Sequence, residues 1–406
     1  MNIKKYFSSL VDLIKTRRLF PFVKQHPYSY FTMVIAVACM GYLYLLLFPV
    51  LAIIGLWALQ VTAQQQVSAE MLSECLLWLA LMVISIAITH HIVSMRFAPP
   101  KGVLLKAEQV PKLFALIHKY TQSKLSARIQ HVIITEHFEL DIRKTPVSGY
   151  PVWSHNSLVI GLPLLQCLSE EQFAHALQRR CLQLKLDRHL LGNWMFHLSG
   201  VWPRYANAFR ARHRLGDQLI AWFFQIYASA YQRFSVYVAQ QTELNLESAA
   251  LAHINDGDLF KTIQTEAVSR YFYNKVYLPK IEQATASGVA APVSVKPYAG
   301  LPSALKKVMT EKRIAQWLAI LAQQPEGNRE PVPSLIQRME NIGHSRIKPP
   351  QLVTISAAKS LFGPAYPAIV QTIDKFWLKH TNQRKTVAAH TRQPTVRPSV
   401  QLGSVA

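Results

Sequence analysis

The sequence predicts a mainly helical α+β protein in which an N-terminal transmembrane hairpin precedes a larger domain with a small sheet. Two long uncharged apolar runs near the N-terminus predict the hairpin, and two short β-branched segments followed by long helical patterns predict the larger domain. Hydrophobic residues make up 50% of the 406 residues and charged residues only 16%, where about 25% is usual in soluble proteins. This composition excludes a chain that is disordered throughout, a collagen and a coiled coil.

The hairpin is predicted from residues 31–59 and 75–95, which contain no Asp, Glu, Lys or Arg. Each run is at least as long as the roughly 20 residues that cross a bilayer. Basic residues flank the outer ends of both runs, whereas the loop Val61–Glu74 between them has none. The positive-inside rule therefore places both termini and the main domain in the cytoplasm, in a multi-pass protein of a bacterial-type inner (plasma) membrane.

The two ends of the chain are basic. Residues 1–30 form a cytoplasmic segment whose first 20 residues are interpreted either as an amphipathic helix on the membrane surface or as a basic flank that only sets topology. Residues 381–406 contain no acidic residue and several Pro and Thr, which predicts a disordered basic tail.

Between these ends, residues 96–345 are expected to form the main domain and residues 346–380 a C-terminal helical element. A helix is predicted from Pro111 to Lys124, and strands at Gln130–Phe138 and Ser157–Leu165. Ser169 is a good N-cap for a helix reaching about His189, with Glu170 and Glu171 in its first turn. The aromatic-rich residues 192–240 are interpreted as a helical pair, and further helices are expected at 303–324, 334–341 and 367–380.

Several segments resemble membrane zinc metallopeptidases of the HtpX and CAAX prenyl protease type, a gluzincin family. The stretch Leu158–His189 is similar to the family's active-site region, and Glu243–Ala250 (ELNLESAA) to its ExEAD stretch. Weaker similarities are Pro333–Gly343 (PSLIQRMENIG) and Ser356–Gly363 (SAAKSLFG). The resemblance covers about Gly102–Gly363 and implies a zincin-like peptidase domain with a small sheet.

The zinc motif itself is degenerate. In the family, the two His of HExxH bind zinc and the Glu polarises water, but the corresponding residues here are Arg179, Arg180 and Gln183, in the sequence RRCLQ. Arg cannot ligate a metal because it stays protonated. The resemblance leaves Glu243 at the third-ligand position and Glu247 at the position of an orienting Asp, and it puts Val332 where the family has a further His. No catalytic residue and no metal ligand are therefore expected.

A buried Glu243 without zinc needs a partner. We expect Arg179 to provide it through a forked ion pair that replaces the metal as the link between the two helices, with Gln183 completing the polar cluster. Because consecutive residues of a helix are rotated by about 100°, Arg180 is expected to point away from Glu243.

These patterns favour a membrane-anchored pseudopeptidase that binds peptides or partner proteins without hydrolysis and needs no cofactor. One alternative is an active zinc metalloendopeptidase in membrane-protein quality control, with displaced ligands and zinc as cofactor. Another is a structural membrane scaffold whose aromatic region docks other subunits. The expected partners are membrane lipid and a peptide or membrane protein. The net charge of +22 is spread along the chain without a nucleic-acid motif, so no specific nucleic-acid binding is expected.

Overall fold

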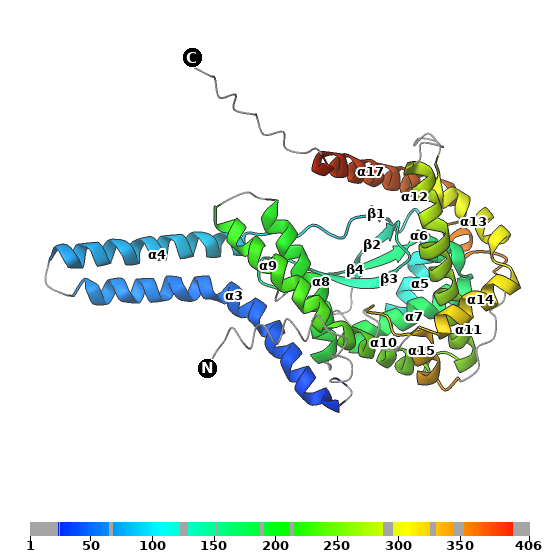
Figure 1. Ribbon diagram of the computed structural model, residues 1–406, viewed down its shortest axis with the longest axis horizontal. Helices are drawn as coiled ribbons and strands as arrows, with labels where there is room; N and C mark the ends of the chain where they lie inside the picture. The colour runs from blue at the N-terminus through cyan, green and yellow to red at the C-terminus, as the bar shows by residue number, and fades with distance from the viewer. Residues whose placement is uncertain are drawn as a thin grey trace, which may run out of the picture.

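The computed structural model describes residues 23, 25–64, 68–121, 129–151, 153–186, 191–211, 215–286, 295–324, 330–344 and 353–392. Helices dominate it, and a small mixed sheet lies inside the larger domain (Figure 1). The expected mainly helical α+β composition is confirmed. In chain order the elements are α3 (Pro27–Thr62), α4 (Ala69–Val93), β1 (Val103–Leu104), α5 (Pro111–Thr121), β2 (Ile129–Thr135), β3 (Leu140–Pro146), β4 (Ser154–Gly161), α6 (Leu162–Cys167), α7 (Glu170–Leu186), α8 (Leu191–Arg210), α9 (Leu215–Phe234), α10 (Val236–Ala250), α11 (Asp256–Tyr271), the π-helix η2 (Phe272–Tyr277), α12 (Leu278–Ala286), α13 (Pro297–Val308), α14 (Glu311–Ala322), α15 (Leu335–Asn341), α16 (Ala357–Phe362), the 3-10 helix η4 (Gly363–Ala365) and α17 (Tyr366–Arg392).

Helices α3 and α4 lie side by side and project from the rest of the molecule as a hairpin (Figure 1). Both are long and apolar enough to cross a membrane. Helix α4 begins six residues before the predicted span, because the Ser68 hydroxyl caps it by accepting a hydrogen bond from the Met71 N–H (3.1 Å). Glu70 lies in its first turn, where the helix dipole favours an acid.

The first half of α3 is buried by protein. Tyr30, Val34 and Ala38 belong to an aromatic-rich core formed with α8 and α9. After the exposed Tyr28 at its start, α3 exposes no further large apolar side chain until Met40, and from there the exposed ones continue to Val61. The part of α3 that is free to contact lipid is therefore shorter than the predicted span 31–59, since its N-terminal portion packs against the main domain.

The sheet has the strand order β1-β2-β4-β3, in which β4 pairs parallel with β2 and antiparallel with β3. The two predicted strands correspond to β2 and β4, whereas β1 and β3 were not expected. The prediction was wrong for Leu162–Leu165, which begin helix α6, because Pro163 fits the first turn of a helix.

The sheet positions α7 in the main core, where Phe173, Ala176 and Leu177 are fully buried. Ser169 and Gln172 start this helix with reciprocal hydrogen bonds, Gln172 N–H to Ser169 Oγ (3.2 Å) and Ser169 N–H to Gln172 Oε1 (3.1 Å). The described part of the helix ends at Leu186, so the expected end near His189 lies outside the described residues.

Helices α16 and α17 pack on the same core as the main domain, through Leu361, Ile373 and Trp377 among others. Residues 346–380 are therefore not a separate unit in their described part. Helix α17 continues to Arg392, so the predicted disordered tail is wrong for residues 381–392. Those residues contain no Gly or Pro, and the first helix breaker is Pro394. Residues 393–406 and the N-terminal segment 1–22, with its proposed amphipathic helix, lie outside the described residues.

Candidate functional site

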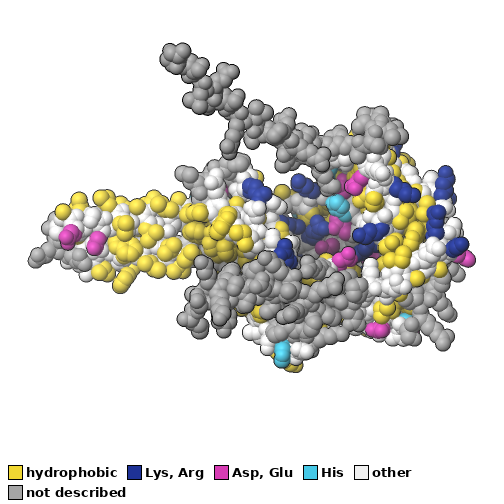
Figure 2. Space-filling model, viewed as in Figure 1, with side chains coloured by type: hydrophobic (Ala, Val, Ile, Leu, Met, Phe, Trp, Pro, Cys, Tyr) yellow, Lys and Arg dark blue, Asp and Glu magenta, His cyan; other side chains and the backbone are white. Residues whose placement is uncertain are grey.

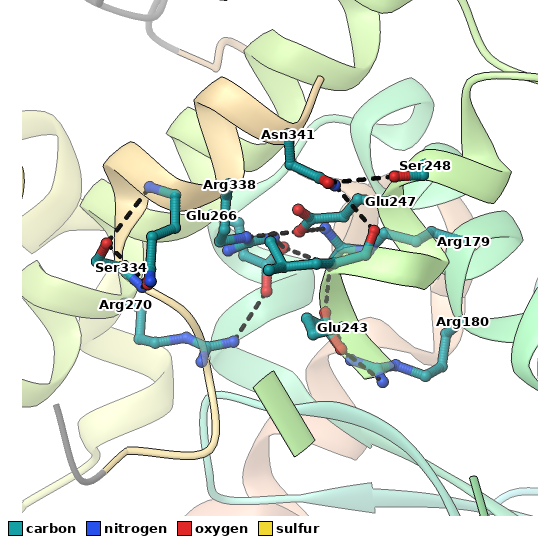
Figure 3. A network of polar contacts seen from close by, with 12 residues as sticks. Arg179, Arg180, Glu243, Glu247, Ser248, Glu266, Arg270, Ser334, Arg338 and Asn341 are labelled. Atoms are coloured by element: carbon teal, nitrogen blue, oxygen red, sulfur yellow. Dashed lines mark hydrogen bonds and ion pairs between the residues drawn. The ribbon is translucent and has the colours of Figure 1, made fainter. Parts of the chain in front are cut away.

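Four helices bring charged side chains together in a buried cluster that we call the Arg–Glu network (Figure 3). It joins elements far apart in the sequence, and it contains four guanidiniums and three carboxylates. Its members are Arg179 and Arg180 from α7, Glu243 and Glu247 from α10, Glu266 and Arg270 from α11, and Arg338 from α15.

Arg179 lies at the centre of the Arg–Glu network. Its Nη2 is 2.8 Å from Glu266 Oε2, and its Nη1 is 3.4 Å from Glu247 Oε1. The distance from Arg179 Nη2 to Glu243 Oε1 is 3.7 Å, which is an ion-pair distance without a hydrogen bond. The expected ion pair between Arg179 and Glu243 is therefore present, but the forked contact is not formed, because the fork of Arg179 is directed at the other two carboxylates.

Arg180 makes the forked contact instead. Its Nη1 lies 3.1 Å from Glu243 Oε2, and its Nη2 donates to Glu243 Oε1 across 3.2 Å. The prediction that Arg180 points away from Glu243 is wrong. A rotation of 100° around α7 moves the Cα–Cβ bond away, but a long, flexible Arg side chain can turn back across the helix surface to an unpaired carboxylate.

Two further arginines complete the neutralisation of the carboxylates. Arg338 Nε donates to Glu247 Oε1 (2.6 Å), and Arg270 Nη2 donates to Glu266 Oε1 (2.8 Å). The sequence reasoning missed Arg270, Glu266 and Arg338. Arg338 could have been considered, because it lies in PSLIQRMENIG, one of the stretches that resemble the peptidase family. For Glu266 and Arg270 the sequence showed only opposite charges four residues apart on one helix.

Gln183 is fully buried one turn after Arg179, but it does not complete the cluster as expected. Neither of its amide atoms has a hydrogen-bond partner among the described residues. Glu247 Oε2 likewise has none there. The hydrogen bonding of the site therefore runs through the guanidiniums rather than through the amide of Gln183.

Burial and the guanidiniums shift the pKa values of the carboxylates in opposite directions. Burial alone raises the pKa of Glu266, but Arg179, Arg338 and Arg270 outweigh it and the pKa is lowered. The pKa of Glu243 is also lowered, because Arg180 and Arg179 outweigh its burial. For Glu247, burial outweighs the attraction of Arg338 and Arg179, and its pKa is raised.

The donor set of the site is unsuited to a metal ion. Each carboxylate faces at least one guanidinium, and a guanidinium repels a dication and has no lone pair to donate. Within the described ranges no group of three or more His, Cys, Asp or Glu side chains is arranged to hold a metal. His175, one turn before Arg179, has its Nδ1 3.4 Å from Thr262 Oγ1. What the arrangement can do is cross-link α7, α10, α11 and α15.

A cavity of about 500 Å³ lies in another part of the domain, between α6, α11, α13, α14 and residues 353–359. Its walls are mainly apolar, and Cys167 is among its lining residues. Burial raises the pKa of the Cys167 thiol to about 12. The thiol is therefore protonated at neutral pH, which argues against a nucleophilic role.

The positions that the sequence motifs compare with a zinc site, residues 179, 180, 243 and 247, lie together in this structure. Comparisons of the chain with models of protein families, with curated proteins and with solved structures find no match. The resemblance to HtpX-type peptidases therefore stays a prediction based on the motifs.

Proposed function

We propose that this chain is a membrane-anchored pseudopeptidase, which binds an extended peptide or a partner protein in a peptidase-like domain and does not hydrolyse it. Three features support the proposal: the projecting apolar hairpin, the motifs that resemble a zinc peptidase, and the Arg–Glu network at the positions of those motifs. The hairpin would hold the domain at the cytoplasmic side of an inner membrane.

One observation carries the proposal: guanidiniums stand at the two positions that the resemblance compares with the first zinc ligand and the general base, and both are paired with carboxylates. Arg179 contacts Glu266 and Glu247, and Arg180 makes a forked contact with Glu243. Moving any of these buried charges aside to admit a metal would leave another charge unpaired, which costs several kcal/mol. The network thus joins helices as a structural metal would, here α7, α10, α11 and α15, without the means to activate water.

The sheet offers a place for an extended segment. Strand β3 lies at one edge of the sheet, paired with β4 alone, and sheet edges can accept a further strand through backbone hydrogen bonds. Asp141 and Arg143 alternate with the buried Leu140 and Ile142 along β3. Figure 2 shows a hollow over the sheet in which basic, acidic and histidine side chains gather. A peptide of mixed charge suits such a surface.

A photocrosslinking experiment in cells tests the binding function. A photoreactive amino acid replaces Arg143 on β3, and a matched variant carries it at Lys312, an exposed position on α14. We expect discrete adducts from position 143 and none from position 312. Equal labelling at the two positions, or no adduct at either, would overturn the binding proposal.

The active-enzyme alternative is tested separately by metal content and turnover. The purified chain, never exposed to chelator, is analysed for zinc and incubated with casein. We expect neither stoichiometric zinc nor cleavage. Zinc near one per chain together with chelator-sensitive cleavage would establish the alternative of an active zinc metalloendopeptidase.

The scaffold alternative depends on the aromatic region of α8 and α9 being available to other subunits. The inner face of this region is covered by α3 of the same chain: Trp202, Phe224 and Tyr231 are fully buried there. Only its outer face remains for another partner, and this observation favours the pseudopeptidase over the scaffold.

A further inference from the structure

Helix α9 runs antiparallel to the first half of α3, and three contacts fix their relative position. The Tyr30 hydroxyl donates to the carbonyl oxygen of Phe234, and the Tyr227 hydroxyl donates to that of Val37 (2.6 Å). Nearer the hairpin, the Tyr44 hydroxyl lies 3.4 Å from the carbonyl oxygen of Leu219. The N-terminal end of α9 is therefore level with residue 44 of α3, and its C-terminal end is level with residue 30.

Near that level α3 begins a continuous run of exposed large apolar side chains. Met40 and Leu43 begin this run, which continues through the hairpin, whereas the exposed Tyr28 stands apart from it at the start of the helix. If the hairpin crosses a membrane, as the proposed function holds, the cytoplasmic boundary of the hydrocarbon region lies near these residues. The first two turns of α9, with Leu219 and Trp222, lie at the same depth, and Ile226 follows one turn further from the hairpin, near the level of Val37.

The outward face of α9 is divided into an apolar and a polar stripe. Leu219, Trp222 and Ile226 recur at helical spacing, and they are 61%, 66% and 56% exposed. Gln218, Gln225 and Gln232 are also exposed and form a separate row at seven-residue spacing. Arg233, seven residues after Ile226, ends the apolar stripe on the side away from the hairpin. A basic residue at this end fits a stripe that leaves the hydrocarbon region toward the cytoplasmic headgroups.

We propose that the apolar stripe Leu219–Trp222–Ile226 lies in the lipid bilayer, so that α9 is a third membrane contact beside the hairpin. This inference rests on the membrane anchor of the proposed function and not on its peptide binding. The occupant of the stripe is lipid, because the stripe is continuous with the exposed apolar surface of α3 at the same depth. Figure 2 shows hydrophobic side chains covering the hairpin and continuing onto the part of the molecule where α9 lies beside α3. Trp222 would lie at the interface, where Trp is enriched.

Single-cysteine labelling in liposomes tests this arrangement. The four native cysteines are replaced, and Cys is introduced into the full chain by Trp222→Cys, Ile226→Cys or Gln225→Cys. Gln225 is adjacent to Ile226 but lies in the polar stripe, so it is a control matched in depth. Each variant is labelled with an environment-sensitive fluorophore, and lipids carrying a nitroxide near the headgroup serve as quencher.

We expect lipid quenching at positions 222 and 226 to be about twofold or more stronger than at position 225, with blue-shifted emission. Leu77→Cys on α4, a strongly exposed hairpin position, reports on the anchor itself. Quenching at 77 without quenching at 222 and 226 would overturn the inference and leave the anchor standing. Absence of quenching at all three positions would overturn both.

A second copy of the chain is the other conceivable occupant of the stripe. In that case the emission of a fluorophore at position 222 or 226 would be blue-shifted, but the quencher-bearing lipids would not quench it. A thiol cross-linker would then join two chains at these positions. That result would also overturn the lipid contact. Equal quenching at 222, 225 and 226 would overturn it as well, because it would mean that the helix has no preferred face toward lipid.

Discussion

Arg179 donates a hydrogen bond to Glu266 across 2.8 Å and so joins α7 to α11, although the two residues are 87 positions apart in the chain. Both side chains are almost completely buried. Arg179 also lies 3.4 Å from Glu247 and 3.7 Å from Glu243, so its removal takes a contact from each of the three carboxylates. Each carboxylate keeps another guanidinium beside it.

Arg179→Met should destabilise the protein by about 1.5–3 kcal/mol, because Glu266 loses a buried hydrogen bond from a charged donor while the other guanidiniums still neutralise the carboxylates. The measurement is the melting temperature of the detergent-solubilised chain, followed by Trp fluorescence. Lys261→Met is the control: Lys261 pairs with Asp258 at 3.3 Å on the surface, where an ion pair contributes about 0–1 kcal/mol. Equal effects of the two substitutions would contradict the central role given to Arg179.

Acid should weaken the fold through Glu243 and Glu266. Their lowered pKa values mean that each contributes stability above the ordinary carboxyl pKa of 4.5, and that this stability is lost as the pH falls through the folded-state value. Glu247, with its raised pKa, acts in the opposite direction: its contribution is greatest below 4.5 and is lost as the pH rises through its folded-state value.

The measurement for this pH dependence is the melting temperature between pH 7 and pH 3. We expect a fall below about pH 4.5 that is shallower in Glu266→Gln, although that variant is less stable at pH 7. Asp258→Asn, a change at a half-exposed surface pair, should keep the slope of the original chain. An unchanged slope in Glu266→Gln would show that other groups govern the acid response.

The combined change Arg179→His, Arg180→Glu and Gln183→His restores the HExxH pattern and should recover zinc binding before it recovers turnover. Without metal the variant should be strongly destabilised, because two guanidiniums are lost beside Glu243. Zinc should raise its melting temperature, since a ligand at about 100 times its Kd stabilises the folded state by about 2.7 kcal/mol. Magnesium is the control and should have no effect. A variant indifferent to zinc would show that the comparison with the zinc motif is misaligned.

Gly41 lies where α3 meets α8 and α9, and Gly41→Ala should destabilise the protein. A Cβ at this position would be 2.8 Å from the ring of Trp202 and 3.0 Å from that of Tyr227. Gly200→Ala on α8 is a matched control, because nothing lies within 4 Å of its Cβ position. An Ala in a helix interior is favoured over Gly by about 0.5–1 kcal/mol, so the control should be neutral or stabilising. Melting temperatures that fall equally would argue against the close packing of α3 on α8.

The positive-inside rule predicts the topology from the distribution of basic residues. A reporter fused after Ala406 should read as cytoplasmic, and one inserted after Gln64, between the end of α3 and the start of α4, should read as external. Both fusions are scored in the same cells. A periplasmic reading at Ala406 would overturn the proposed orientation of the main domain.

The two apolar helices of the hairpin and the capped start of α7 could be predicted from the sequence. Each is a local property: a run without charge, and a Ser before a helix with acids in its first turn. The proximity of residues 179 and 243 was also expected, because the resemblance compares both positions with ligands of one zinc site.

Tertiary structure alone decided which charges pair. Arg180 rather than Arg179 makes the forked contact with Glu243. The shortest contact of Arg179 is with Glu266, which lies on a helix outside the motifs. The outcome depends on how four helices cross, and helical periodicity within one segment carries no information about the angle and depth of another. The same holds for α9: its amphipathic pattern is visible in the sequence, but only its packing against α3 decides that Trp222 faces outward at the level of the hairpin.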